Sequence, residues 1–476
     1  MDEQFNESKR PVNPRRRKRT KMQIFKETYL PVIIAGLALV LIIVFIIGAI
    51  TRRVQKNKAE EASRIAESSS IAAEQARLEQ AAQDLIVQAE NLIVIYDYEG
   101  AIALLNSFEG DISKFPIIND KILECEAAQK ALVPWDDPNL IPNLSFQLLI
   151  ADPARGFSHR TYGNSINRNF VTTDEFAKIL QQLYDNGYIL VNFEDFITTE
   201  TGIDGTSVYA PKAVLLPNGK KPIMITQTNV NYNYYLIDSD GDKMADAGGA
   251  GIASKLIWDG SQFTCEMADA NGNIVTGDFD LVPILEKFVA AHPDFSYQGA
   301  KATLAVTGYN GLFGYRTQPS AKETFGETAY QQAIQEAKNV AAALRNNGYT
   351  LACYTYENIG YGDNSLTQIK ADLNNWVGEV EPILGSLEVF AFAQLSDITN
   401  DFLYSGEKFE TLHELGFRYY LGFCNDGSPW AAVTDTYVHQ GRIMVTGSNM
   451  AHHADWFTGL FDPASVLNTI RGNIPG

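Results

Sequence analysis

Four aspartates in one short segment have the spacing of a cation-binding loop. They stand at positions 1, 3, 5 and 9 of the segment and are Asp238, Asp240, Asp242 and Asp246. Carboxylates at alternate positions around a glycine turn can wrap oxygen ligands around one hard cation, as in calcium loops of the EF-hand kind. At position 12, where an EF-hand supplies a bidentate glutamate, this chain has Gly249. The segment is interpreted either as a structural calcium site of modest affinity or as a solvated acidic turn.

Tyrosines are frequent near the ends of the predicted strands, and aromatic faces can stack on sugar rings. The candidates for such glycan-binding platforms are Tyr232, Tyr309 and Tyr356. Core packing is the alternative role for each of them. The four cysteines include no C-x-x-C pair, so neither a disulfide framework nor a thiolate zinc site is predicted.

The segments that must position these residues alternate strand with helix from residue 144 onward. Apolar stretches of strand length, such as 221–228 and 349–356, alternate with amphipathic stretches such as 329–348. This alternation predicts an α/β fold in which helices cover a parallel sheet. Seven or so strands in one domain of about 330 residues predict a closed or nearly closed β/α barrel, with its site at the C-terminal strand ends.

A transmembrane helix is predicted at 29–50. No charged residue occurs between Glu27 and Arg52, and the apolar stretch is longer than the 7 to 15 residues of a cleaved signal peptide. Residues 1–28 hold nine basic and four acidic side chains, a net of +5. Because basic flanks stay in the cytoplasm, we expect a single-pass protein of the cell membrane with a cytoplasmic N-terminus and an extracellular C-terminal domain.

The rest of the chain is acidic and falls into four further segments. The whole chain carries -19, so the part after residue 28 carries -19 - 5 = -24, which argues against nucleic-acid binding. A helical stalk is predicted at 51–82 and a helical hairpin at 83–132, which resembles one tetratricopeptide unit without the repeat of an array. A proline-rich linker at 133–143 precedes the barrel domain at 144–476.

Residues 144–476 resemble the polysaccharide deacetylases of the NodB homology family, specifically the membrane-anchored forms of monoderm bacteria. The resemblance rests on FQLLIADPARGF, on VPILEKFVAAHPDFSYQGAKATLAVTGYNGLFGYRTQ and on NVAAALRNNGYTLACYTYENIGY. It implies an irregular (β/α)7 barrel of polysaccharide deacetylase type. It also implies an enzyme that removes N-acetyl groups from cell-wall amino sugars, by hydrolysis of a non-peptide C–N bond.

The resemblance fails at the positions that carry the family's chemistry. That chemistry needs a metal held by one aspartate and two histidines, with a carboxylate base beside the metal-bound water. Thr228 stands where the base is expected and Asn229 where the carboxylate ligand is expected, while Tyr354 and Asn358 replace the two histidines. Two further family positions also differ, and these are Gln147 in the first strand and Gln394 in a later turn.

Amide and phenol groups are poor ligands for zinc, so we expect no zinc at these positions and no hydrolysis. The predicted function is binding of cell-wall polysaccharide or peptidoglycan, or an envelope scaffold, by an inactive deacetylase-like domain. One alternative is an active metal-dependent N-deacetylase with a rearranged site, using groups such as Glu357, His452 or His453. The other is that the helical region recruits envelope proteins.

Overall fold

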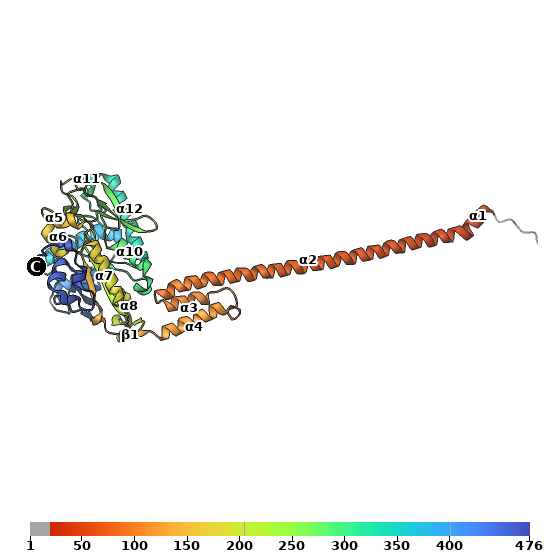
Figure 1. Ribbon diagram of the computed structural model, residues 1–476, viewed down its shortest axis with the longest axis horizontal. Helices are drawn as coiled ribbons and strands as arrows, with labels where there is room; N and C mark the ends of the chain where they lie inside the picture. Colours follow the sequence, from red (N-terminus) through yellow and green to blue (C-terminus); the bar gives the residue numbers. More distant parts are fainter. Residues whose placement is uncertain (1–19, 204, 400) are drawn as a thin grey trace, which may run out of the picture. The chain divides into compact units, whose positions relative to one another are not determined.

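The computed structural model describes residues 20–203, 205–399 and 401–476 (Figure 1). The chain divides into two units, Met1–Gln83 and Asp84–Gly476. Of the basic segment predicted at 1–28, residues 1–19 lie outside the described residues.

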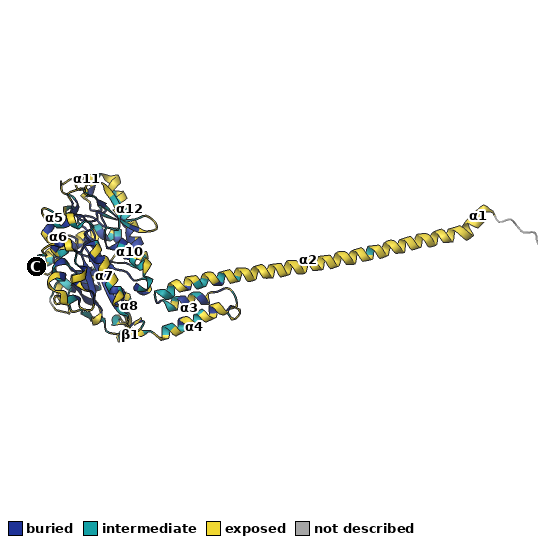
Figure 2. Cartoon of the chain, in the orientation of Figure 1, coloured by how far each residue is buried: buried dark blue, intermediate teal, exposed yellow. Residues whose placement is uncertain are grey.

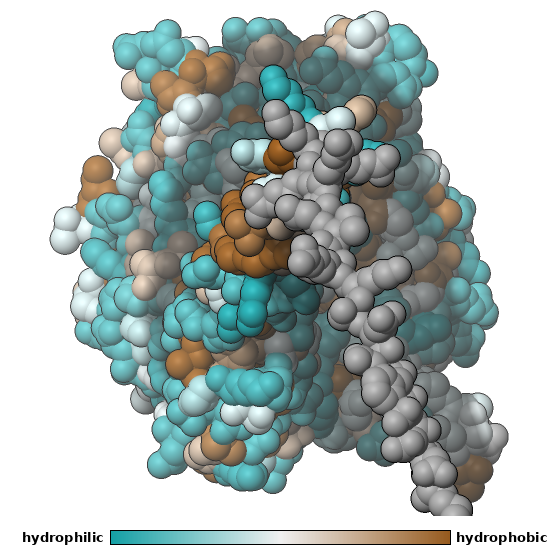
Figure 3. Space-filling model, turned by 90° about the vertical axis from the view of Figure 1, so that its right-hand side faces the viewer, coloured by the Kyte–Doolittle hydropathy of each residue, from teal (hydrophilic) through white to brown (hydrophobic). Residues whose placement is uncertain are grey.

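The first unit is helical. The short helix α1 (Lys21–Ile24) and one π-helical turn (Phe25–Tyr29) lead into α2 (Leu30–Val94). The apolar side chains of its N-terminal half are exposed, for example Phe45 at 77% (Figure 2). In Figure 3 the hydrophobic residues are brown, and one group of them stands out among the mostly teal, hydrophilic residues of the view. The helix is long and apolar enough to cross a membrane, where such side chains are favoured over water.

The second unit begins with the end of α2, followed by α3 (Tyr98–Asn106) and α4 (Pro116–Lys130). Asp97 caps α3 by accepting a hydrogen bond from the backbone N–H of Gly100. The buried side chains between α3 and α4 are Ala101, Leu105, Ile118 and Cys125. The hydroxyl of Tyr96 donates to the carbonyl of Asp294 at 2.8 Å, which ties the end of α2 to the barrel domain.

Seven parallel strands close into a barrel in the part of the chain that the structure describes. Their order is β11-β12-β13-β14-β16-β2-β7, and β7 pairs with β11 to complete the ring. Their bounds are β2 (Asn143–Phe146), β7 (Lys221–Thr228), β11 (Thr303–Val306), β12 (Thr350–Cys353), β13 (Val389–Ala391), β14 (Tyr419–Phe423) and β16 (Val438–Met444). Strand β3 (Tyr188–Leu190) adds to β7, and β15 (Ala431–Val433) pairs antiparallel with β16. The predicted α/β barrel of seven strands is confirmed.

Helices surround the barrel. The longer ones are α7 (Thr173–Asp185), α10 (Leu281–Ala291), α12 (Glu327–Asn346), α13 (Leu366–Asn375) and α15 (Glu407–Glu414). The shorter ones are α5 (Pro153–Ser158), α6 (Gly163–Asn169), α8 (Phe193–Phe196), α9 (Tyr234–Ile237), α11 (Ala321–Phe325), α14 (Glu381–Leu384), α16 (Gly447–His452) and α17 (Pro463–Val466). Helix α7 begins at a capping box formed by Thr172 and Glu175 and ends before Gly187, whose φ is +79°.

Three small antiparallel sheets lie outside the barrel. Two of them have two strands each: β1 (Val133–Trp135) pairs with β6 (Val214–Leu216), and β4 (Ile197–Thr201) pairs with β5 (Ser207–Pro211). The third has three strands, β8 (Lys255–Trp258), β9 (Phe263–Ala268) and β10 (Ile274–Gly277). Strand β1 belongs to the segment 133–143, so this segment is paired with the barrel domain through β6.

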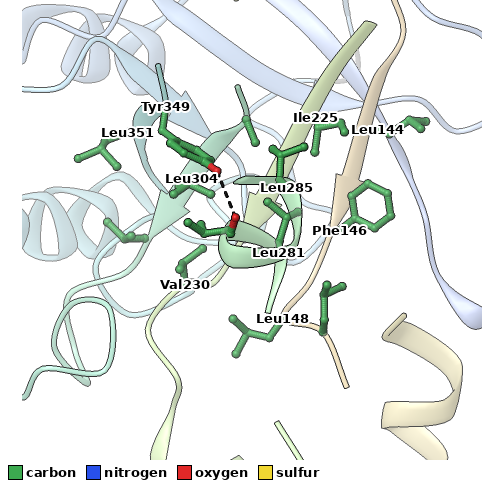
Figure 4. Close-up of a cluster of buried hydrophobic side chains, with 14 of the residues drawn as sticks. Leu144, Phe146, Leu148, Ile225, Val230, Leu281, Leu285, Leu304, Tyr349 and Leu351 are labelled. Carbon is green, nitrogen blue, oxygen red and sulfur yellow. Dashed lines mark hydrogen bonds between the residues drawn. The ribbon is translucent and has the colours of Figure 1, made fainter. Parts of the chain in front are cut away.

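The main core lies between the outer wall of the barrel and the helices. Figure 4 shows Leu144 and Phe146 of β2 and Ile225 of β7 near Leu281 and Leu285 of α10. All five are almost completely buried, and each such side chain contributes roughly 1.5–3 kcal/mol relative to an exposed one. This packing fixes the strand ends on which the site is built.

Candidate functional site

A pocket of about 450 Å³ opens where six of the barrel strands end. Its lining residues at these strand ends are Gln147, Asn229, Tyr354, Asn358, Gln394, Phe423, Cys424, Met444 and Thr446. Loops and short helices supply the rest of the lining, namely Ser165, Arg168, Asn169, Phe170, Tyr235, Leu395, Asn425, Ser448, Asn449 and Trp456. The C-terminal end of a parallel barrel is where ligands bind in this type of fold.

The pocket brings together five of the six positions at which the sequence departs from the deacetylase pattern. Gln147, Asn229, Tyr354, Asn358 and Gln394 all line it, although they come from four different strands. The sixth position lies just below: Thr228 is fully buried, and its hydroxyl donates to the carbonyl of Phe146 at 3.2 Å.

The chain turns sharply where three of these strands end. Asn229 after β7, Asn358 after β12 and Gln394 after β13 have φ values of +63°, +55° and +57°. This left-handed conformation is uncommon outside glycine, costs of order 1–3 kcal/mol, and concentrates at functional sites. The turns therefore place the amide side chains at the pocket at the expense of backbone strain.

Several polar groups of the pocket have no hydrogen-bond partner among the residues that the structure describes. The side-chain oxygen of Asn358 is buried without a hydrogen bond. No side-chain hydrogen bond joins Gln147 or the hydroxyl of Tyr354 to another described residue, although Tyr354 is only 4% exposed. Since buried polar groups are normally paired, these groups are available to hydrogen-bond a ligand that displaces water.

Aromatic side chains form part of the pocket wall. Trp456 stacks on His453 with ring centroids 4.6 Å apart, while Phe423 and Tyr235 line other parts of the wall. Burial raises the pKa of Tyr235, an effect that hydrogen bonds with Asn233 and Asn229 partly offset, so its phenol stays neutral at physiological pH. The wall thus combines flat apolar faces with neutral hydrogen-bonding groups.

The tyrosines expected as sugar platforms lie elsewhere. Tyr232 is fully buried, and its hydroxyl donates to the Asp280 carboxylate at 2.7 Å. Tyr356 is 6% exposed and hydrogen-bonds Glu379, while Tyr309 does not line the pocket. The left-handed turns at the strand ends rotate neighbouring side chains into the core, and the sequence periodicity gives no sign of such turns. The sequence did not identify Trp456 and Phe423 as pocket residues, because they lie in C-terminal segments that carry no motif.

The donor set of the pocket does not fit zinc. No aspartate, glutamate or histidine is among the lining residues that the structure describes, and the sulfur-containing side chains are the thiol of Cys424 and the thioether of Met444. Burial raises the pKa of Cys424 to about 12, so it is a thiol rather than a thiolate near neutral pH. Glu357, His452 and His453, which a rearranged site would recruit, do not line the pocket either. No reaction step through a metal follows from this donor set.

The acidic loop gathers three of its four aspartates. Oxygen atoms of Asp238, Asp240 and Asp246 lie within 4.8 Å of one another, and Asp242 is not part of the group. The loop also satisfies its own carboxylates: Asp238 accepts from the N–H groups of Gly241 and Lys243, both at 2.7 Å. The three converging carboxylates supply some of the oxygen ligands that a calcium ion needs. The backbone N–H groups that already donate to them are what an acidic turn without an ion would show.

Calcium titration distinguishes these two interpretations of the loop. We expect the full chain to bind one Ca²⁺ with a Kd of roughly 10⁻⁴–10⁻³ M, the range of weak extracellular sites. Asp240→Asn is expected to weaken binding, because it removes one converging charge, whereas Asp242→Asn is the matched control outside the group. A melting temperature that does not respond to millimolar Ca²⁺ would identify the loop as an acidic turn.

Comparison with known proteins yields one structural likeness. No protein-family model matches the chain, and no curated protein has a matching sequence. Among solved structures, the chain is similar to the deacetylase PplD of Streptococcus pyogenes, determined in complex with acetate. The identity is 12% and the TM-score 0.32, over 67% of this chain and 95% of that one. The fold itself is defined by the strand order and by the closure of the barrel through β7 and β11.

Proposed function

We propose that this protein is a membrane-anchored glycan-binding protein whose barrel domain lies outside the cell and holds cell-wall polysaccharide or peptidoglycan without hydrolysing it. The observation that carries the proposal is the pocket at the strand ends. It offers unpartnered amide and hydroxyl groups beside aromatic faces, and no carboxylate or imidazole among the lining residues that the structure describes.

The chemistry of the pocket suits a carbohydrate. Sugars present hydroxyl groups around their edge and apolar C–H faces, so they need neutral donors and acceptors together with flat platforms. Asn358, Gln147 and Tyr354 supply the first kind of group, and Trp456 and Phe423 supply the second. A volume of about 450 Å³ is within the usual range of small-molecule sites and suits a short stretch of glycan.

Membrane anchorage is proposed from the apolar part of α2. Its exposed apolar surface and the excess of basic residues before it support a single-pass span with the N-terminus in the cytoplasm. The barrel domain would then face the cell wall, which is where a glycan ligand for the pocket is found.

Removing the largest aromatic platform should weaken glycan binding. Trp456→Ala in the full chain is expected to lower the affinity for chitotetraose about tenfold, or ~1.4 kcal/mol, because the stacking face is lost. Isothermal titration in detergent measures the change. Phe402→Ala is the matched control, since Phe402 is 60% exposed and does not line the pocket, and it should bind like the wild type. Equal loss in both variants would contradict the assignment of the pocket.

The same preparation tests the two alternatives. Acetate release from N-acetylated chitooligosaccharides together with stoichiometric zinc would overturn the non-hydrolytic proposal in favour of an active deacetylase. Absence of any glycan binding, with retention of envelope proteins by residues 51–132, would favour a recruiting role for the helical region.

A further inference from the structure

The pocket carries positive charge although the protein as a whole is acidic. Arg168 is the charged side chain among the lining residues that the structure describes, while the chain has a net charge of -19. Arg168 lies on the exposed side of α6 and forms no hydrogen bond or ion pair with another described residue. Its guanidinium group is therefore free to meet a ligand at the rim.

A second cation lies beneath the pocket floor. Arg442 of β16 is fully buried, two residues before Met444, which lines the pocket. Its guanidinium carbon is 4.8 Å from the ring centroid of Phe423 and 6.0 Å from that of Tyr354, and both rings line the pocket. The guanidinium group thus lies directly behind the side chains that a ligand would touch.

Arg442 has no carboxylate in direct contact among the residues that the structure describes. Its Nε donates to the carbonyl of Gly422 at 3.1 Å and its Nη2 to that of Phe392 at 2.7 Å, while its Nη1 is buried without a partner. Asp397 is the carboxylate whose charge acts on it, but Asp397 is bound to Tyr404 and His439. No ion pair with Arg442 occurs among the described residues. An arginine stays protonated even when buried, so this charge acts on its surroundings without a directly bound counterion.

We propose that the pocket selects a glycan bearing an anionic substituent, a carboxylate or a phosphate, whose charge is held between Arg168 at the rim and Arg442 below the floor. This inference depends on the proposed glycan-binding function and names its ligand class. A low-dielectric floor transmits the field of Arg442 better than water does, and the guanidinium fork of Arg168 matches carboxylate and phosphate oxygens.

Matched pairs of ligands test the proposal with the full chain in detergent at low salt. The carboxylate pair is hyaluronan tetrasaccharide and its carboxyl-reduced neutral counterpart. The phosphate pair is N-acetylglucosamine 6-phosphate and N-acetylglucosamine. We expect at least one anionic member to bind about tenfold more tightly than its neutral counterpart, and the pair in which this occurs identifies the anion. Raising the salt concentration should reduce the difference in affinity between the anionic and the neutral member of the pair, because salt screens exposed charges.

Substitutions of single arginines test which residue produces the preference for the anionic ligand. Arg168→Gln is expected to remove most of the difference in affinity between each anionic member and its neutral counterpart. Arg160→Gln is the matched control, since Arg160 is exposed and does not line the pocket, and it should keep the preference. If the Arg442→Met variant folds, it tests the contribution of the buried charge. If it does not fold, Arg168→Gln still tests the proposal. Equal affinity within both pairs overturns this proposal alone, whereas absence of binding to all four ligands overturns the proposed glycan-binding function.

Discussion

Replacing Asn229 by aspartate and both Tyr354 and Asn358 by histidine is expected to turn the pocket into a zinc site. The three positions line one pocket, and the substitutions supply one carboxylate and two imidazoles, which leaves a coordination position open for water. Backbone conformation tolerates the change, because Asn229 and Asn358 are in the left-handed region, where aspartate and histidine are enriched as asparagine is. The chain should go from no retained zinc to one ion per molecule.

Metal analysis after gel filtration measures this gain. The control variant Asn229→Asp, Tyr354→Phe, Asn358→Gln introduces the same carboxylate without imidazoles and is expected to retain no zinc. Adding Thr228→Asp supplies the missing base for acetate release, at a cost in stability because the new carboxylate faces the Phe146 carbonyl that Thr228 now donates to. A folded triple variant that retains no zinc would contradict the prediction that these three positions are arranged to hold a metal ion.

The barrel could be predicted because its signal is local and repeated. Strand β7 occupies Lys221–Thr228, the stretch 221–228 that the apolar pattern selected. The hydrophobic periodicity of each segment distinguishes a strand from a helix. Seven such strand–helix units in one domain can be arranged in few ways other than a closed barrel. The family motifs then placed the substituted positions at strand ends, which is where the pocket lies.

The walls of the pocket could not be predicted in the same way. Trp456 lies in a late loop and Arg168 on the short helix α6, and neither belongs to a motif or a periodic pattern. Tyr232 was a candidate sugar platform with core packing as the alternative, and its hydroxyl lies in the core against Asp280, where its own φ is +54° and that of Asn229 is +63°. Arg442 lies behind the pocket wall, and its burial inside the barrel depends on the strand order and not on its sequence neighbours.

Removing Arg471 is expected to destabilise the barrel domain by about 3–5 kcal/mol, because it leaves a buried carboxylate without its counterion. Arg471 and Glu175 are almost completely inaccessible, and two hydrogen bonds of 2.6 Å join them. Arg471 also donates to the carbonyl of Phe170, which lines the pocket, so it fastens the C-terminal segment to this wall. Urea unfolding of Arg471→Met measures the loss. The double variant with Glu175→Gln should recover much of it, since no unpaired charge then remains.

The pH dependence of the same variant separates a lost charge pair from lost packing. Burial raises the pKa of Glu175, but the hydrogen bonds and charge of Arg471 and the N–H groups of Thr172 and Asn468 outweigh burial, so its pKa is lowered. A carboxyl whose pKa is lowered on folding stabilises the native state above its unfolded pKa, near 4.3, and loses that contribution as pH falls through the folded value. In Arg471→Met burial is no longer balanced by the arginine, so the Glu175 pKa rises and acidification should stabilise the variant relative to the wild type. A constant difference in unfolding free energy from pH 7 to pH 4 would instead assign the effect of Arg471 to packing.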